Sequence, residues 1–175
     1  MKTPMKLKTV LFFVIACMFT TIASAQTDKG KPLASPRDSV SGTVAGSTIT
    51  INYGSPSVKG RKIWGGLVPY KTVWRTGANE ATTFTTTKSI TVEGKKLAAG
   101  TYGFFAIPTA TSWTIIFNSV PKQWGAFKYD MMKDQLRVDV MPVALPAVKE
   151  MLGYNIAPTG FSLDWEMLSV PVAVE

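Results

Sequence analysis

The segment VWRTGANE, at residues 73–80, holds the densest group of polar side chains in the chain. Arg75 offers a planar fork of five hydrogen-bond donors, and Glu80 is either its ionic partner or, if buried, a general acid or base. Asn79 tolerates a left-handed turn and can bond nearby backbone. Two interpretations stay open: an Arg–Glu pair that braces a loop while Trp74 packs in the core, or a site for binding or catalysis.

Four residues outside this segment extend the candidate site. Trp124 precedes a glycine on an expected loop, where its ring either forms a platform for a sugar or another planar ligand or covers one end of the fold. Arg37 lies just before the first expected strand and either binds an anion or remains a solvated arginine. Tyr70 and Tyr102 are candidate proton donors. The candidate binding residues are Arg37, Trp74, Arg75, Asn79, Glu80 and Trp124, and the candidate catalytic residues are Glu80, Arg75 and Tyr102.

The composition excludes several kinds of chemistry. The chain has no histidine and one cysteine, so it has no Ser-His-Asp triad, no Cys-His dyad and no imidazole ligand for zinc. Asp164 and Glu166 lie two residues apart on an expected strand, so both should face solvent opposite Trp165. Residues 130–139 lack the glycine turn and closing glutamate of an EF-hand, and no phosphate-binding glycine loop occurs. The sequence therefore predicts neither a metal nor a cofactor.

The first 25 residues have the pattern of a secretory signal. Three lysines precede an apolar run at residues 10–19, and small residues follow it, which predicts cleavage after Ala25. The run is shorter than the ~20 residues that a membrane-spanning helix needs. In an alternative interpretation, lipidation of Cys17 anchors the protein. We therefore expect export to the periplasm or the medium, with no transmembrane span in the mature chain.

Cleavage would leave a moderately basic chain. Removing the three lysines of the signal from 19 basic residues leaves 16, against 11 acidic ones, with no run of like charges. This balance predicts no nucleic-acid partner. The only cysteine leaves as well, so the core alone must stabilise the mature chain, and its length suffices for that. The oligomeric state stays open.

After a polar lead-in at residues 26–35, the hydrophobic pattern predicts one all-β domain at residues 36–175. Polar and apolar residues alternate with a period of two, which is typical of strands with one buried face. We expect a loop with one helical turn at residues 119–135. The expected strands lie at residues 47–53, 81–87, 89–92, 95–97, 101–107, 112–118, 136–140, 148–156, 161–166 and 170–174. About eight to ten short strands favour a single antiparallel β-sandwich or jelly roll, with a β-barrel as the alternative.

Several motifs in a fixed order make the chain similar to a known family. They are SPR at 35–37, PSVKGR at 56–61, LVPY at 67–70, VWRTGANE at 73–80, GKKL at 94–97, AGTY at 99–102 and QWG at 123–125. Over about residues 33–174 the chain resembles DUF2911, a domain family of unknown function found mainly in exported proteins of Bacteroidetes and related bacteria. The resemblance implies a β-rich exported domain and no established reaction. Ser55 departs from the family, which often carries arginine before the proline, so a ligand site that used this arginine would be altered.

Three hypotheses for the function remain. The first is a non-catalytic domain of the cell envelope that binds a glycan, an envelope component or another protein. The second is an enzyme such as a sugar lyase or hydrolase, with Glu80 as acid or base, Arg75 as charge stabiliser and Tyr70 or Tyr102 as proton donor. The third is a structural protein of an envelope assembly. Fold class alone does not separate them.

Overall fold

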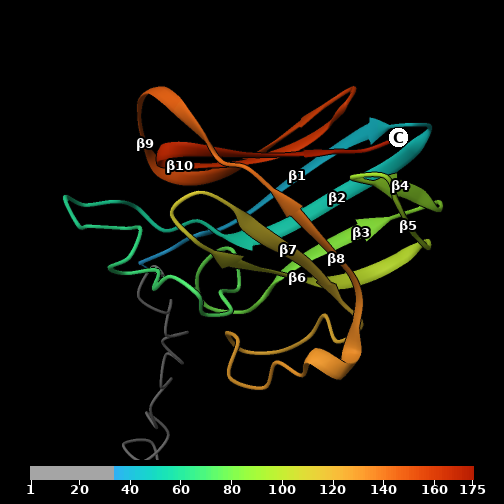
Figure 1. The fold of residues 1–175 in the computed structure, drawn as a ribbon, viewed down its shortest axis with the longest axis horizontal. Coiled ribbons are helices and arrows are strands. Elements are labelled where there is room, and N and C mark those ends of the chain that lie inside the picture. Colours follow the sequence, from blue (N-terminus) through green and yellow to red (C-terminus); the bar gives the residue numbers. More distant parts are fainter. Residues whose placement is uncertain (1–33) are drawn as a thin grey trace, which may run out of the picture. The chain divides into compact units, whose positions relative to one another are not determined.

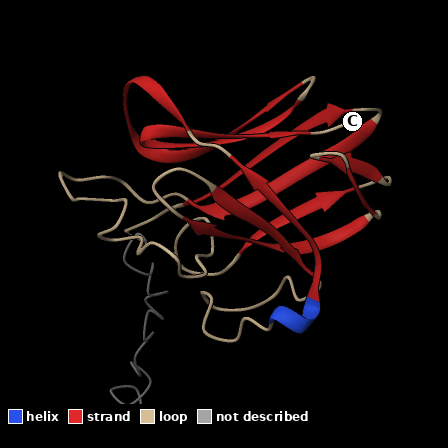
Figure 2. Ribbon diagram, in the orientation of Figure 1, coloured by secondary structure: helices blue, strands red, loops and turns tan. Residues whose placement is uncertain are grey.

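Strands dominate the computed structural model, which describes residues 34–175 (Figures 1 and 2). The expected signal segment at residues 1–25, the cleavage after Ala25, lipidation of Cys17 and most of the lead-in at 26–35 lie outside the described residues. Within the described range, no helix has both the length and the apolar character to cross a membrane.

The described chain forms ten strands. They are β1 (Arg37–Val44), β2 (Ser47–Gly54), β3 (Thr82–Thr86), β4 (Ile90–Val92), β5 (Lys95–Leu97), β6 (Gly100–Pro108), β7 (Trp113–Asn118), β8 (Asp134–Val140), β9 (Val143–Ala157) and β10 (Gly160–Ala173), with a 3-10 turn (Met131–Lys133) before β8. Six of them form an antiparallel sheet in the order β1-β2-β3-β6-β7-β8. The hairpins β9–β10 and β4–β5 are separate two-stranded sheets.

The β9–β10 hairpin packs across one face of the six-stranded sheet, and the main core lies between the two layers (Figure 1). Phe161 of β10 contacts rings from both β3 and β6, with centroid distances of 5.2 Å to Phe84 and 5.7 Å to Phe104. A bridge between Val92 and Val174 joins β4 to the end of β10. The sheets do not close on each other, so the fold is the expected all-β sandwich and not a barrel.

The alternation of polar and apolar residues in the sequence matches the alternation of exposed and buried side chains on β2. On β2, Ile49 and Ile51 are fully buried while the threonine between them is only half-buried. On the central strand β6, Phe104 faces the main core and Phe105 faces the opposite side of the sheet, yet both are buried. The outer side of β6 is therefore also covered.

The chain at β10 differs from the two separate strands expected at residues 161–166 and 170–174. It is one strand in which the buried set changes from odd to even positions, between Trp165 and Val170. The change occurs at Glu166, which has a φ of 57° and lies at a break in the register with β9. An extra residue in one strand shifts the alternation by one, so a β-bulge explains the pattern.

Four tryptophans meet in the core at one end of the sandwich. Trp64 and Trp74 come from the chain between β2 and β3, Trp113 from β7 and Trp165 from β10. The ring of Trp64 lies 4.9 to 5.8 Å from the other three. Because such rings bury large areas, this cluster attaches the long β2–β3 connection to both layers.

Residues 32–175 form one compact unit that contains the whole described core. A unit with its own core has what a domain needs to fold alone. We refer to this part of the chain as the β domain.

Candidate functional site

The backbone of residues 73–80 runs alongside the six-stranded sheet instead of joining it. The N–H and C=O of Trp74 both bond to Ala106 of β6, at 2.8 and 2.9 Å. The side chain of Trp74 is buried in the tryptophan cluster. Its expected place in the core is confirmed, so Trp74 does not present a binding surface.

Thr76 is fully buried and holds a left-handed backbone, with a φ of 51°. Its carbonyl accepts hydrogen bonds from the hydroxyls of Tyr154 (2.8 Å) and Thr82 (3.2 Å), and its own hydroxyl donates to the Phe104 carbonyl (3.0 Å). These bonds satisfy polar groups that would otherwise be costly inside the protein. Burial raises the pKa of Tyr154 far above its ordinary range, so this residue stays a neutral donor.

Sequence reasoning did not select Tyr154, although it holds the centre of the motif. It lies on β9, far along the chain, and its alternation identifies it only as a core-facing residue. Its ring also packs against Tyr53, with centroids 4.7 Å apart. No local signal distinguishes a buried tyrosine that packs from one that also binds a distant carbonyl.

Glu80 pairs with Arg37 and not with Arg75. The Arg37–Glu80 distance is 2.5 Å, and 49% and 44% of the two side chains are exposed. The expected Arg75–Glu80 brace is therefore wrong, because Arg37 at the start of β1 lies nearer to the carboxylate. Since both side chains are about half-exposed, water weakens the attraction.

Arg75 is half-buried, and within the described residues its Nε has no hydrogen-bond partner. Burial lowers the pKa of its guanidinium from the ordinary value. Arginine nevertheless remains protonated in proteins. Arg75 is therefore a cation with donor capacity to spare, and it is the member of the motif that internal contacts explain least.

Asn79 and Trp124 link the motif to the chain between β7 and β8. Asn79 has the expected left-handed backbone, with a φ of 64°, and its side-chain amide donates to the Ser35 carbonyl at 3.0 Å. The N–H of Gly125 donates to the Asn79 carbonyl. Trp124 forms a backbone bridge with Glu80, and 60% of its surface is exposed. Of the predicted binding residues, Trp124 presents the most open apolar surface.

The candidate catalytic residues do not converge on one reacting position. The carboxylate of Glu80 is paired with Arg37. Tyr102 is buried and its hydroxyl donates to the Ala98 carbonyl at 2.9 Å, while burial raises its pKa. Tyr70 is 38% exposed. A general acid or base must lie within hydrogen-bond reach of its substrate, and none of these side chains lines the cavity described next.

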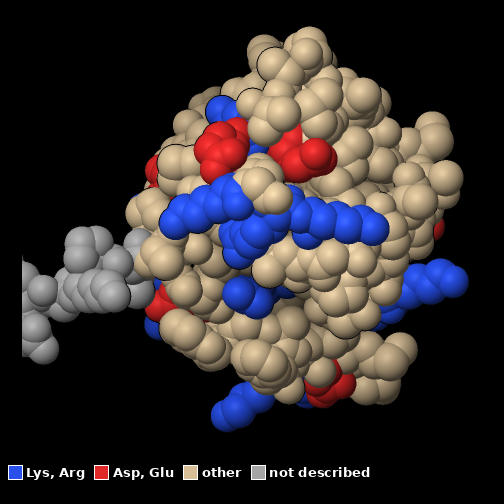
Figure 3. All heavy atoms as spheres, turned by 90° about the vertical axis from the view of Figure 1, so that its left-hand side faces the viewer, with Lys and Arg blue, Asp and Glu red and all other residues tan. Residues whose placement is uncertain are grey.

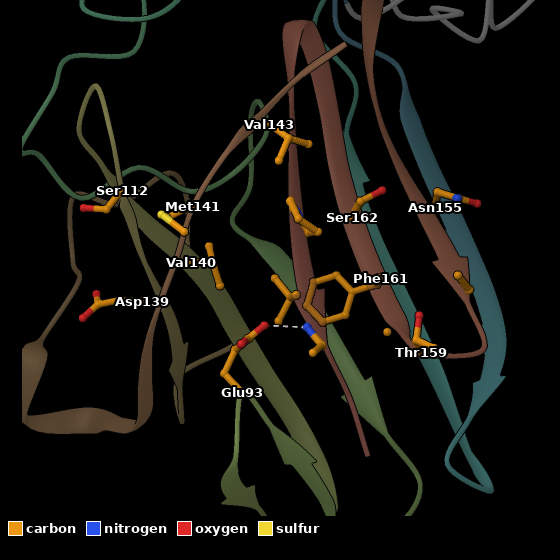
Figure 4. A pocket seen from close by; sticks show the side chains of 15 residues that line it. Glu93, Ser112, Asp139, Val140, Met141, Val143, Asn155, Thr159, Phe161 and Ser162 are labelled. Atoms are coloured by element: carbon orange, nitrogen blue, oxygen red, sulfur yellow. Dashed lines mark hydrogen bonds between the residues drawn. The ribbon is translucent and has the colours of Figure 1, made fainter. Parts of the chain in front are cut away.

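A cavity lies elsewhere, between the end of β8 and the β9–β10 hairpin. It has a volume of about 650 Å³ and is open to solvent. Val140 and Met141 lie on one side in Figure 4 and Thr159 and Ser162 on the other, with the ring of Phe161 between them. We call this cavity the inter-sheet cleft, since the six-stranded sheet and the hairpin both contribute to it.

Two carboxylates lie at the inter-sheet cleft, and each is already hydrogen-bonded. Glu93 accepts the N–H of Ala173 at 2.6 Å (Figure 4), and Asp139 accepts the hydroxyl of Thr114 at 2.6 Å. None of the binding or catalytic residues predicted above lines this cleft. Sequence reasoning missed it because Phe161 and its apolar neighbours have the same alternation as core residues.

A basic surface lies on the side of the domain that carries the β2–β3 connection. Figure 3 shows lysine and arginine side chains in a row across this face, with acidic side chains beside them. The connection supplies exposed Lys59, Arg61 and Lys62. Arg61 is committed to structure, because its guanidinium donates to the carbonyls of Ser57 and Val58. Glu150 lies beside Lys59 and accepts its backbone N–H.

Metal binding has no visible basis in the part of the chain that the structure describes. No three acidic or cysteine side chains gather there in a way that would hold an ion.

Comparison with known proteins identifies a family but no characterised relative. No curated protein and no solved structure matches the chain. A family model described as "Protein of unknown function (DUF2911)" matches residues 35–174. This match covers nearly all of the described β domain, and the chain therefore belongs to the DUF2911 family.

Proposed function

We propose that the protein is an exported, non-catalytic binding domain of the cell envelope, and that a small amphipathic molecule binds in its inter-sheet cleft. The lining of the cleft carries this proposal. Val140, Phe161 and Val172 are almost fully buried beneath it, and most of the surface of the cleft is apolar, although six of its residues carry polar side chains. An apolar concave site with a few polar groups is the usual form of a small-molecule site.

The polar groups of the cleft favour a ligand with hydrogen-bond donors or a positive charge at one end. Glu93 and Asp139 are both acceptors, and each has oxygen lone pairs beyond the one bond described above. The apolar part of such a ligand would contact Val143 and Met141, which are 51% and 73% exposed. Covering these side chains removes apolar surface from water, which is favourable.

Binding fits the residues of the cleft better than catalysis does. Its hydroxyl and carboxyl groups include no pair in which one side chain activates another as a nucleophile. Glu93 and Asp139 bond to a backbone N–H and a threonine hydroxyl instead. The signal pattern of the sequence supports the other part of the proposal, which is export to the cell envelope.

A matched pair of substitutions tests the proposal. Val143→Trp places a large ring in the inter-sheet cleft, whereas Val148→Trp changes an equally exposed valine of the same strand outside it. We expect Val143→Trp to weaken binding of Nile red, a neutral apolar probe, by at least about tenfold, which corresponds to ~1.4 kcal/mol. Equal affinities for both variants and the unchanged β domain would place the probe elsewhere and refute the proposal.

A further inference from the structure

The chain between β7 and β8 exposes five large apolar side chains within a short stretch, of which Val120 is the least exposed at 38%. We call residues 119–133 the apical loop; Figures 1 and 2 show it, with its 3-10 turn, on the opposite side of the six-stranded sheet from the β9–β10 hairpin. The exposed fractions are 60% for Trp124, 87% for Phe127, 63% for Met131 and 82% for Met132. Single exposed apolar residues are ordinary, but a group of them marks an interaction surface.

The exposure does not result from a loosely attached loop. Ala126 and Tyr129 pack against Phe105 and Ile116 on the outer face of the sheet. The Asn118 side chain donates to the Asp130 carbonyl at 2.9 Å, inside the loop. The same loop thus partly buries Ala126 and Tyr129 against the sheet and leaves Phe127 and Met132 in water.

Hydrogen bonds fix the end of the apical loop where it enters β8. The hydroxyl of Tyr129 donates to Asp134 at 2.6 Å and accepts from Arg137 at 2.7 Å. Arg137 also forms a salt bridge with Asp134 at 2.7 Å. The N–H of Ser119 donates to the Lys133 carbonyl and closes the base of the loop.

The charges of the apical loop are mainly positive. Lys122, Lys128 and Lys133 are all exposed, and neither of the two salt bridges found in the described chain includes them. The acidic residue of the loop, Asp130, uses its carboxylate to accept the N–H of Met132 at 2.9 Å. The lysines alternate along the chain with the exposed apolar residues.

This mixture matches a lipid surface better than a protein partner. Lysine is depleted at the centre of protein interfaces, but Lys128 directly follows Phe127 and Lys133 directly follows Met132. At a bilayer, apolar side chains enter the acyl boundary while lysines extend to the headgroups. We propose that the apical loop docks the β domain onto a bilayer that contains anionic lipids.

Vesicle binding tests this proposal. The β domain, residues 32–175, is mixed with vesicles of phosphatidylcholine alone or with phosphatidylglycerol added, and sedimented. We expect binding to the anionic vesicles that weakens at high salt. The double substitution Phe127→Ser with Met132→Ser should weaken it by at least about tenfold, because two large apolar side chains no longer leave water. Removing each lysine should weaken it by about fivefold.

A matched control distinguishes binding through the apical loop from non-specific binding through any exposed apolar residue. Leu67→Ser with Val148→Ser changes two exposed apolar residues outside the loop, and it should leave binding unchanged. Trp124 provides a second readout, since the other four tryptophans are buried and insertion should shift its emission to shorter wavelength. All variants are checked for an unchanged melting temperature.

Three outcomes would overturn the proposal. If the β domain stayed in the supernatant with both vesicle types, a lipid surface would be excluded as the partner. Equal weakening by the loop and control variants would assign binding to general apolar exposure. Concentration-dependent dimerisation that the loop variant abolishes, without vesicle binding, would show that a second copy of the chain covers the loop.

Discussion

Arg37 and Glu80 meet at the surface although they lie far apart in the sequence. Their half-exposed pair ties the start of β1 to the segment that carries the VWRTGANE motif. Water competes for both groups, and each long side chain loses freedom when the pair forms, so such pairs contribute little. The negative charge of Glu80 therefore contributes little to the stability of the fold.

Replacing Glu80 with glutamine should cost less than about 1 kcal/mol of unfolding free energy. The substitution keeps the shape of the side chain and removes the charge. Urea unfolding of the β domain measures the change. A double-mutant cycle with Arg37→Gln then isolates the coupling between the two side chains, which we expect to be roughly 0.2–1 kcal/mol. A loss of 3 kcal/mol or more, the order reported for a broken buried pair, would contradict the half-exposed geometry.

The end of β2 packs closely against the VWRTGANE segment at residues 73–80. The N–H of Ala78 donates to the Gly54 carbonyl at 3.1 Å. A Cβ atom on Gly54 would collide with the carbonyl of Ala78. Glycine is needed here for close approach and not for a left-handed backbone. This contact, together with Tyr154 and Thr76, makes the 73–80 segment a junction between β2, β6 and β9.

Gly54→Ala should therefore destabilise the β domain by about 1–3 kcal/mol, because the new methyl group forces backbone apart. Gly153→Ala is the matched control, since its Cβ would first meet the Lys149 side chain at an ordinary 3.6 Å. Thermal and urea unfolding of both variants measure the difference. If the two variants were equally stable, the close approach of β2 to the motif would be wrong.

In the molecule as a whole, two buried tyrosines and the partly buried Tyr129 form hydrogen bonds between different strands and loops. Tyr53 donates to Asp38 at 3.0 Å, and burial together with this bond raises its pKa to about 12. Burial and the bond to Asp134 raise the pKa of Tyr129 to about 12 as well. Burial raises the pKa of Tyr154 further still. All three are neutral in the folded protein well above the ordinary tyrosine pKa.

The free energy of unfolding should fall as the pH rises from about 10 to 12. Unfolded tyrosines lose their protons near the lower value, while Tyr53 and Tyr129 in the folded state keep theirs until about 12. The unfolded state then binds fewer protons, so alkali favours it. Melting temperatures across this range measure the effect. Tyr53→Phe should make the pH dependence shallower, because it removes one of the tyrosines whose pKa is raised in the folded state.

The inter-sheet cleft is formed by elements from both layers of the molecule. β8 is the last strand of its sheet, and β9 pairs with β10 instead of continuing that sheet. The two layers therefore separate at this edge, and apolar residues that close the core elsewhere line an opening here. No single element contains the site.

The all-β class, most strand positions and the family were predictable from the sequence, and Asn79 was recognisable as a residue that tolerates a left-handed turn. These features depend on near neighbours: side chains alternate with a period of two, and turn residues act on their own backbone. Even the bulge at Glu166 is visible in the sequence, because the apolar positions change from odd to even numbers there, although the sequence does not show the cause.

Which side chains meet depends on how distant strands pack, and therefore followed only from the fold. It paired Glu80 with Arg37, placed the Tyr154 hydroxyl on the Thr76 carbonyl, and opened the inter-sheet cleft beside Phe161. Alternation specifies which face of a strand is buried but not which strand lies opposite it, and these contacts join residues from distant strands. Polar residues at the motif were therefore visible in the sequence, while their role as a structural junction was not.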